Sequence, residues 1–319
     1  MRSKHLIDPE LLAGLERFPT FDFSQELLPM IRQQMAAMAA GMPTPDSHDA
    51  KLEERKIVSS AGHEIGIIIH TPRQAASTRP AVLHIHGGGY IIGTAKMSSA
   101  SNLQKAVAAD CVVVSVDYRL APEAIHPGPV EDCYQALKWL HENAASLGVD
   151  ASRIAVEGES AGAGLAAAVA LLARDRGEVA IIHQHLIYPM LDDRTCVAET
   201  QAFAGEFVWT PKSNLFGWSS LLGCAPGGDG ISCYAAAARA EDLSGLPSTF
   251  IAVGALDLFA QEDIEYARRL IQAGVPTELH VYPGAYHGFE MAAEAQVSMR
   301  AQHNSISALR RALHAAAWS

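Results

Sequence analysis

Ser160 is the residue whose type and surroundings point most directly to chemistry, as the third residue of the pentapeptide GESAG at 158–162. An apolar run with β-branched residues, 153–156, precedes the pentapeptide, and a stretch of small residues, 164–172, follows it. This order predicts a tight turn from a strand to a helix, where the hydroxyl of a G-x-S-x-G serine stands clear of the sheet. The helix N-terminus beside it offers N–H groups to an oxyanion. The pattern also occurs by chance, so the hypothesis of a nucleophilic serine needs further residues.

A nucleophilic serine needs a base that takes its proton and an acid that orients the base. In the strand–turn–helix architecture the chain order is serine, acid, histidine. Asp257 and His287 satisfy that order, and each follows a predicted strand. We therefore expect His287 to be the base and Asp257 the acid. Glu262 and Asp263 lie nearby in the chain and are competing candidates for the acid.

A glycine run, His86-Gly-Gly-Gly, follows a buried apolar strand and predicts an oxyanion hole. Glycines allow the backbone to turn its N–H groups toward a developing negative charge. The expected donors are the N–H groups of Gly88, Gly89 and Ala161, and each such donor can contribute roughly 3 kcal/mol in a transition state. A phosphate-binding loop is the alternative, but neither G-x-G-x-x-G nor G-x-x-x-x-G-K-[ST] is present in this run.

The pair His84-x-His86 shares one face of a predicted strand, and zinc is an alternative there. That pair has no evident third ligand, and no H-E-x-x-H motif occurs. The pair His183-x-His185 repeats the pattern and is expected to be ordinary packing. The sequence therefore predicts no metal site.

The elements that must position these residues alternate between strands and helices. Strands are predicted at 57–58, 65–70, 81–86, 111–116, 153–156, 179–186, 249–253 and 277–282, and helices at 10–17, 24–41, 99–109, 130–147, 164–172, 262–273 and 292–316. The alternation indicates an α/β fold with a mostly parallel, doubly wound sheet. Residues 192–235 interrupt it with aromatic and small residues and are expected to form an excursion over the sheet.

Composition restricts the class of protein. The 319 residues include 24 basic and 35 acidic side chains, and the formal net charge of −11 argues against nucleic acid or an anionic membrane as a partner. The N-terminus lacks the apolar region of a signal peptide, and no apolar run approaches the ~20 residues that span a bilayer. We expect a cytoplasmic protein without membrane insertion. The odd, scattered set of five cysteines predicts reduced thiols.

The motifs together resemble the hormone-sensitive-lipase-like (bacterial family IV) carboxylesterases of the α/β-hydrolase fold. The matching pieces, in the family's order, are HGGGY at 86–90, DYRLAPE at 117–123, GESAG at 158–162, Tyr188-Pro189, Asp257 and HGF at 287–289. The chain departs from the family in two places. Glu159 stands where aspartate or threonine is usual, and Asp257 is followed by Leu258 rather than proline, with Gln261 where an acid is common.

The resemblance implies an architecture and an activity. It implies an eight-stranded, mostly parallel sheet flanked by helices, with a helical cap built from 1–50 and 192–235 over a catalytic core of 51–191 and 236–319. It implies a serine carboxylesterase that hydrolyses small-molecule esters of short-to-medium acids, about two to eight carbons, through an acyl-enzyme without a cofactor. It also implies a homodimer through the edge strand at 277–282.

The pocket is the least determined part of the expectation, because it depends on cap residues. The candidate substrate-binding side chains are Met35, Met38, Tyr90, Tyr188, Phe207, Trp209 and Phe289. An amidase, lactonase or deacetylase would use the same groups. Some plant receptors of this fold bind ligands without turnover and lack the catalytic histidine, and the presence of His287 argues against that role.

Overall fold

The chain folds around one eight-stranded sheet with the strand order β1-β2-β4-β3-β5-β6-β7-β8. A computed structural model describes residues 2–17, 20–42, 48–74, 76, 78–199 and 201–314. The strands are β1 (Ala50–Val58), β2 (Glu64–Pro72), β3 (Arg79–Ile85), β4 (Val112–Asp117), β5 (Val149–Glu159), β6 (His183–Ile187), β7 (Ser248–Gly254) and β8 (Thr277–Tyr282). β1–β2 and β2–β4 pair antiparallel, and all the other neighbours are parallel. The predicted eight-stranded, mostly parallel sheet is confirmed.

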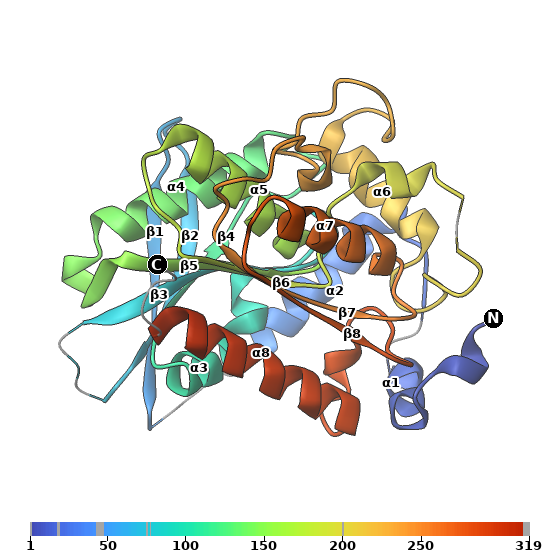
Figure 1. The fold of residues 1–319 in the computed structure, drawn as a ribbon, viewed down its shortest axis with the longest axis horizontal. Helices are drawn as coiled ribbons and strands as arrows, with labels where there is room; N and C mark the ends of the chain where they lie inside the picture. The colour runs from blue at the N-terminus through green and yellow to red at the C-terminus, as the bar shows by residue number, and fades with distance from the viewer. Residues whose placement is uncertain are drawn as a thin grey trace.

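Helices cover both faces of the sheet, which is why its central strands are apolar runs rather than alternating patterns. One face carries α3 (Ser99–Ala108) and α8 (Gln296–His314), and the other carries α4 (Gly128–Glu142), α5 (Ala161–Arg176) and α7 (Ala260–Gln272) (Figure 1). α5 is buried around almost its whole circumference, from Ala161 to Ala173. Its alanines and glycines allow it to lie close to the sheet, beside α4 (Figure 1).

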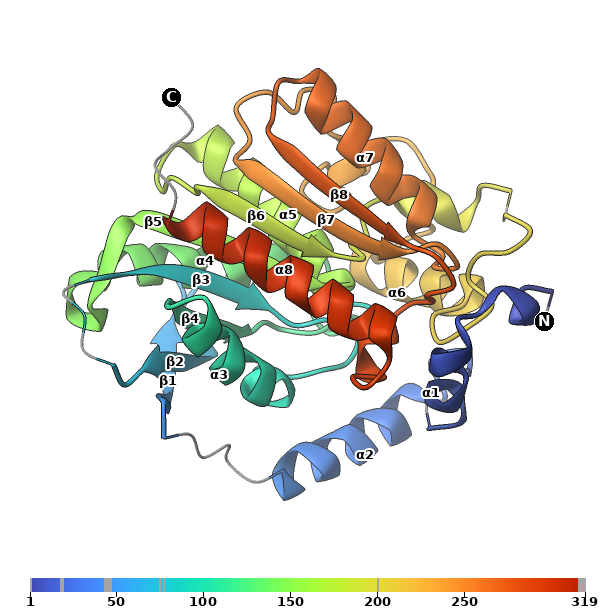
Figure 2. The same ribbon diagram turned by 60° about the horizontal axis from the view of Figure 1, so that its bottom comes forward.

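The remaining helices gather at the end of the sheet toward which the parallel strands point (Figure 2). They are α1 (Leu12–Arg17), α2 (Leu28–Gly41) and α6 (Pro211–Leu222). The N-terminal segment and α6 are linked there by side chains: the Thr210 hydroxyl donates to Asp22 at 2.6 Å, and the N–H of Phe23 donates to the Ser213 hydroxyl at 3.1 Å.

The element boundaries differ from the predicted ones at several places. The helix predicted over 130–147 ends at Glu142, where Asn143 leaves the helical conformation. A 3-10 turn, Ala145–Leu147, follows and ends at Gly148, which adopts a left-handed conformation. The last helix begins at Gln296 rather than at 292, since the 3-10 turn Phe289–Met291 occupies the preceding residues. The predicted end of that helix, at 315–316, lies outside the described residues.

Two further findings concern the whole chain. No helix in the described part of the chain combines the length and the apolar character needed to cross a membrane. All five cysteines are described and free of disulfides, as predicted from their number and scatter.

Candidate active site

Ser160 lies at a sharp turn between the end of β5 and the first residue of α5. Its φ of 56° and ψ of −122° are unusual for a residue with a side chain and store strain. The turn is held by main-chain bonds: the N–H of Ser160 donates to Ile187 at 2.9 Å, and its carbonyl accepts from Met190 at 3.1 Å. Gly162 is required there, because an added Cβ would stand 2.1 Å from the carbonyl oxygen of Ile85.

The structure brings the predicted serine, histidine and aspartate together at the ends of three strands. The Oγ of Ser160 is 2.9 Å from Nε2 of His287, and Nδ1 of His287 is 2.8 Å from Oδ2 of Asp257. Asp257 is fully buried, and its second oxygen accepts the N–H of Phe259 at 3.0 Å. An imidazole held in this way has one nitrogen fixed by the carboxylate and the other free to take the serine proton.

The loops that carry Asp257 and His287 are tied to each other rather than only to the sheet. The N–H of Leu256 donates to the carbonyl of Ala285 at 2.9 Å, and the N–H of Ala255 donates to that of Tyr282 at 2.8 Å. The separation between the acid and the base is therefore determined by main-chain bonds.

The glycine run follows β3 and faces the start of α5. Gly88 and Gly89 have φ values of 121° and 60°, which residues with a Cβ rarely adopt. Among the hydrogen bonds of the described residues, the N–H groups of Gly88, Gly89 and Ala161 have no acceptor. Three unoccupied donors beside Ser160 are what a tetrahedral oxyanion requires.

Aromatic rings surround the imidazole of His287. Tyr188 and Phe259 approach it edge-on at centroid distances of 4.7 Å and 5.2 Å, and Trp209 lies at 6.3 Å. Trp209 also lies against the glycine run, since a Cβ on Gly89 would be 2.2 Å from its ring. These rings make the surroundings of the base apolar, which strengthens electrostatic interactions there.

The other predicted pocket residues do not lie around the imidazole of His287. Tyr90, Phe207 and Phe289 are almost wholly buried in the core, and the Tyr90 hydroxyl donates to the carbonyl of Met190 at 3.1 Å. The cause for Tyr90 is its φ of 68°, which turns the ring away from the glycine loop into the core. On α2, Met35 packs half-buried against the main core, and Met38 is 64% exposed. The expectation that these side chains contact a substrate gains no support.

Two residues that orient Trp209, Val208 and Asn214, were not predicted from the sequence. The N–H of Trp209 donates to the carbonyl of Phe207 at 2.7 Å, which closes a γ-turn around Val208 with a φ of 62°. A β-branched residue in that conformation is an outlier, and no local sequence pattern predicts it. The indole N–H then donates to buried Asn214 at 3.2 Å. Asn214 is on α6 and Trp209 lies just before that helix, so only their spacing of five residues could have suggested this contact.

The competing acids Glu262 and Asp263 are on α7 and neither contacts His287. The carboxylate of Glu262 accepts the N–H of Leu191 at 2.7 Å and the hydroxyl of Thr195. Burial raises the pKa of Glu262 to about 8 and raises the pKa of Asp263 well above its usual value. For both groups burial therefore favours the uncharged form.

The histidine pairs are engaged in polar contacts within the fold. His183 contacts the Ser248 hydroxyl at 2.9 Å, His185 contacts that of Ser305 at 2.8 Å, and His84 contacts that of Ser115 at 2.8 Å. Within the described residues, no group of three or more histidine, cysteine or acidic side chains is arranged to hold a metal ion.

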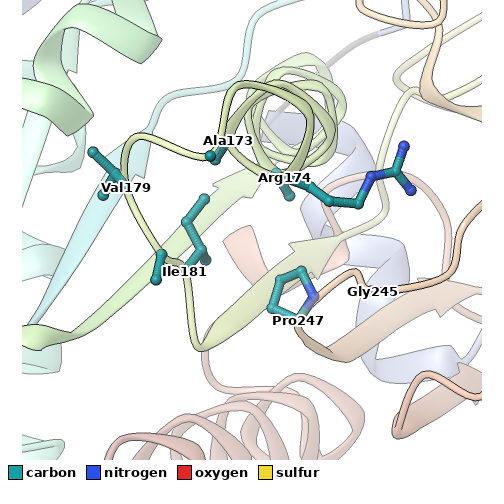
Figure 3. Close-up of a pocket in the computed structure, with 9 residues that line it drawn as sticks. Ala173, Arg174, Val179, Ile181, Gly245 and Pro247 are labelled. Carbon is teal, nitrogen blue, oxygen red and sulfur yellow. The ribbon is translucent and has the colours of Figure 1, made fainter.

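A hollow of about 250 Å³ lies at the opposite end of α5 from Ser160 (Figure 3). It is lined mainly by apolar residues, including Ala173, Val179 and Pro247, with Arg174 at its side. The Arg174 guanidinium already donates to the carbonyls of Asp242 and Ser244. A helix of 16 residues is about 24 Å long, so the hollow is remote from the triad.

Comparison with known proteins agrees with this geometry. Residues 82–291 match the family model described as alpha/beta hydrolase fold. The chain is 33% identical to esterase LipI of Mycobacterium tuberculosis, over 98% of this chain and 97% of that protein. It is 34% identical to carboxylesterase NlhH of the same organism, over 97% of each chain. Among solved structures it is similar to a bacterial heroin esterase, with a TM-score of 0.90 and 40% identity over 98% of this chain and 99% of that one.

Proposed function

Because the chain belongs to the alpha/beta hydrolase fold family, as a carboxylic ester hydrolase of the hormone-sensitive-lipase-like group, we propose that Ser160, His287 and Asp257 carry its ester hydrolysis. The single observation that supports this assignment most is the contact of 2.9 Å between Ser160 Oγ and His287 Nε2. A base at that distance can take the hydroxyl proton as the oxygen attacks.

In the proposed mechanism, Ser160 Oγ forms a bond to the ester carbonyl carbon while its proton passes to His287 Nε2. The carbonyl oxygen becomes an oxyanion that accepts the N–H groups of Gly88, Gly89 and Ala161. The tetrahedral intermediate collapses, the bond to the alcohol oxygen breaks, and His287 gives its proton to that oxygen. Water then attacks the acyl carbon while its proton passes to His287, and the bond to Ser160 Oγ breaks as His287 returns a proton to that oxygen. Asp257 stabilises the imidazolium in both halves of the reaction.

We propose acyl groups of about two to eight carbons as the substrate class. The position of Trp209 supports this limit, since its ring stands against Gly89 at one side of the site and 6.3 Å from His287. A wall so close to the proposed oxyanion donors leaves little length for the acyl chain. The Trp209 ring, backed by Phe23 at 5.6 Å, is part of the helical cap that 1–50 and 192–235 are proposed to form.

The experiment is a series of p-nitrophenyl esters from acetate to palmitate, measured with the wild type, Ser160→Ala and Asp257→Asn. We expect kcat/KM to peak at a short or medium acyl chain, Ser160→Ala to abolish turnover, and Asp257→Asn to lower kcat by about 10³- to 10⁴-fold. Turnover that persists in Ser160→Ala would refute the triad. A peak at palmitate would refute the size limit, and turnover confined to amides or lactones would assign the same groups to another bond.

A further inference from the structure

The residue before the nucleophile is bound to a buried histidine on the neighbouring strand. Both carboxylate oxygens of Glu159, at the end of β5, lie 3.1 Å and 3.0 Å from Nε2 of His84 on β3. The other ring nitrogen of His84 lies 2.8 Å from the hydroxyl of Ser115 on β4. β5, β3 and β4 are adjacent in the sheet. A polar chain therefore runs from the nucleophile turn across three strands, through an imidazole that is fully buried.

Burying such a row of polar side chains costs free energy. A pair of charged side chains lies next to it. Lys105 of α3 contacts Glu157 at 2.6 Å, and both are buried. Glu157 stands opposite His84 in the register of β5 and β3. The cluster holds two carboxylates, Glu157 and Glu159, and Lys105 pairs with the first of them. Burial opposes ionisation of Glu159, but the electrostatic attraction and hydrogen bond of His84 hold the pKa of Glu159 below its usual value.

Glu159 also contacts the two other parts of the candidate site through its main chain. A Cβ on Gly87 would be 2.8 Å from the carbonyl oxygen of Glu159, so the glycine run lies directly against this residue. The next residue is Ser160, whose Oγ contacts His287. The side chain of Glu159 keeps 29% exposure while that of His84 has none. Its carboxylate is thus bound to His84 and still partly exposed.

We propose that His84 and Glu159 form a positioning pair that holds the turn of Ser160 in place. This inference rests on the proposed function. The hydrogen bonds between Glu159 and His84 oppose rotation of the strained turn, so that Ser160 Oγ keeps its contact with His287. The pair acts through Ser160 and His287 and does not touch the substrate.

Several other ionisable groups face this pair and contribute to its field. They are Lys105, Glu157, His86, Asp117 and His70 around the buried side, and Tyr188, Glu290 and Asp257 toward the triad. His70 is the useful control among them. It is fully buried on β2, its Nδ1 lies 3.2 Å from the carbonyl of Val113, and it has no contact with the nucleophile turn.

The experiment measures kcat, KM and the pH dependence of kcat/KM for Glu159→Gln, His84→Gln, the double variant and His70→Gln. We expect the two single variants to lose about tenfold in kcat with KM within twofold, and the double variant to lose little more, because residues that act as a unit are not additive. The change acts on the position of Ser160, so we expect the loss to appear in kcat, with KM kept, at every pH of the profile. His70→Gln should keep kcat within twofold.

Glu159→Asp covers the case in which the glutamine variant does not fold. It shortens the side chain and weakens the contact with His84, so we expect a lower kcat with KM within twofold. The proposal is overturned if kcat of the folded Glu159 variants stays within twofold of the wild type, or if His70→Gln loses as much as His84→Gln. Failure of the proposed function would appear separately, as turnover that survives Ser160→Ala.

Discussion

Single residues of the candidate site differ in how far their surroundings can adjust. The nearest atom to a Cβ on Gly162 is a main-chain oxygen of β3, which is fixed in the sheet. The nearest atom to a Cβ on Gly89 belongs to the Trp209 ring, a side chain that can shift at some cost. A change at Gly162 should therefore disturb the fold, while one at Gly89 should disturb chiefly the oxyanion loop and the aromatic wall. Strain and close approach are concentrated where the reaction is proposed to occur.

The buried carboxyl group of Glu262 gives a second prediction for a single residue, the dependence of stability on pH. Its pKa is about 8 in the folded chain against 4.5 in a free glutamate, so the unfolded chain loses its proton first as the pH rises. Stability from this group is complete below pH 4.5 and is lost as the pH rises through 8. Glu262→Gln mimics the protonated form. We compare the thermal midpoint of Glu262→Gln with that of the wild type. When the pH is raised from 5 to 8.5, the difference between the two midpoints should shift by about 5 °C in favour of the variant.

The control for that measurement is Glu265→Gln on the same helix, where the Arg268 hydrogen bond lowers the pKa of an exposed carboxylate. The gap between this variant and the wild type should not widen with pH. A constant gap for Glu262→Gln as well would show that Glu262 is ionised in the folded protein.

At the scale of elements, the side chain of Arg32 anchors α2 to the loops around the glycines of the proposed oxyanion hole. The guanidinium of Arg32 donates to the carbonyl of Ile91 at 2.8 Å and to that of Ala121 at 2.6 Å, and pairs with Glu123 at 2.7 Å. Ile91 lies two residues after the glycine run, and the N–H of Ala121 donates to the carbonyl of Tyr90, the residue between them. The position of the N-terminal helix is therefore coupled to the loop that supplies Gly88 and Gly89.

Arg32→Ala should loosen both α2 and this loop. We expect faster cleavage of the N-terminal segment under limited proteolysis and a fall of about five- to tenfold in kcat, because hydrogen bonds to a charged donor are worth about 1.5–3 kcal/mol each. Arg268→Ala, which removes an exposed pair with Glu265 on α7, serves as the matched control and should change neither. Equal cleavage rates in the two variants would rule out the coupling.

For the whole molecule, the two edges of the sheet are unlike each other. β1 carries the charged run KLEERK on one edge, which discourages pairing with another chain. β8 forms the other edge with the sequence TELHVY, where Glu278 is paired with Arg311 and His280. With its acid neutralised and Val281 41% exposed, β8 is the edge better suited to a second copy. Dimerisation through 277–282 stays a prediction.

Val281→Lys tests that prediction by placing a charge on the β8 edge. We expect the wild type to sediment as a dimer and this variant as a monomer with unchanged kcat per chain. Val58→Lys, on the already charged β1 edge and 72% exposed, should leave the dimer intact. A wild-type monomer at micromolar concentration, or a dimer that survives Val281→Lys, would contradict the use of this edge.

Local sequence determined the order of the elements, the sheet class and the positions of Ser160, Asp257 and His287, because turns, glycine runs and hydrophobic periodicity act over a few residues. Their convergence followed from the rule that parallel strands end at one edge of the sheet. The surroundings of the triad depended on tertiary structure. The φ of Tyr90 and the γ-turn at Val208 decided which aromatic side chain enters the core and which faces His287. The contact of His84 with Glu159 joins residues 75 positions apart, and such a pairing exists only once packing has chosen it.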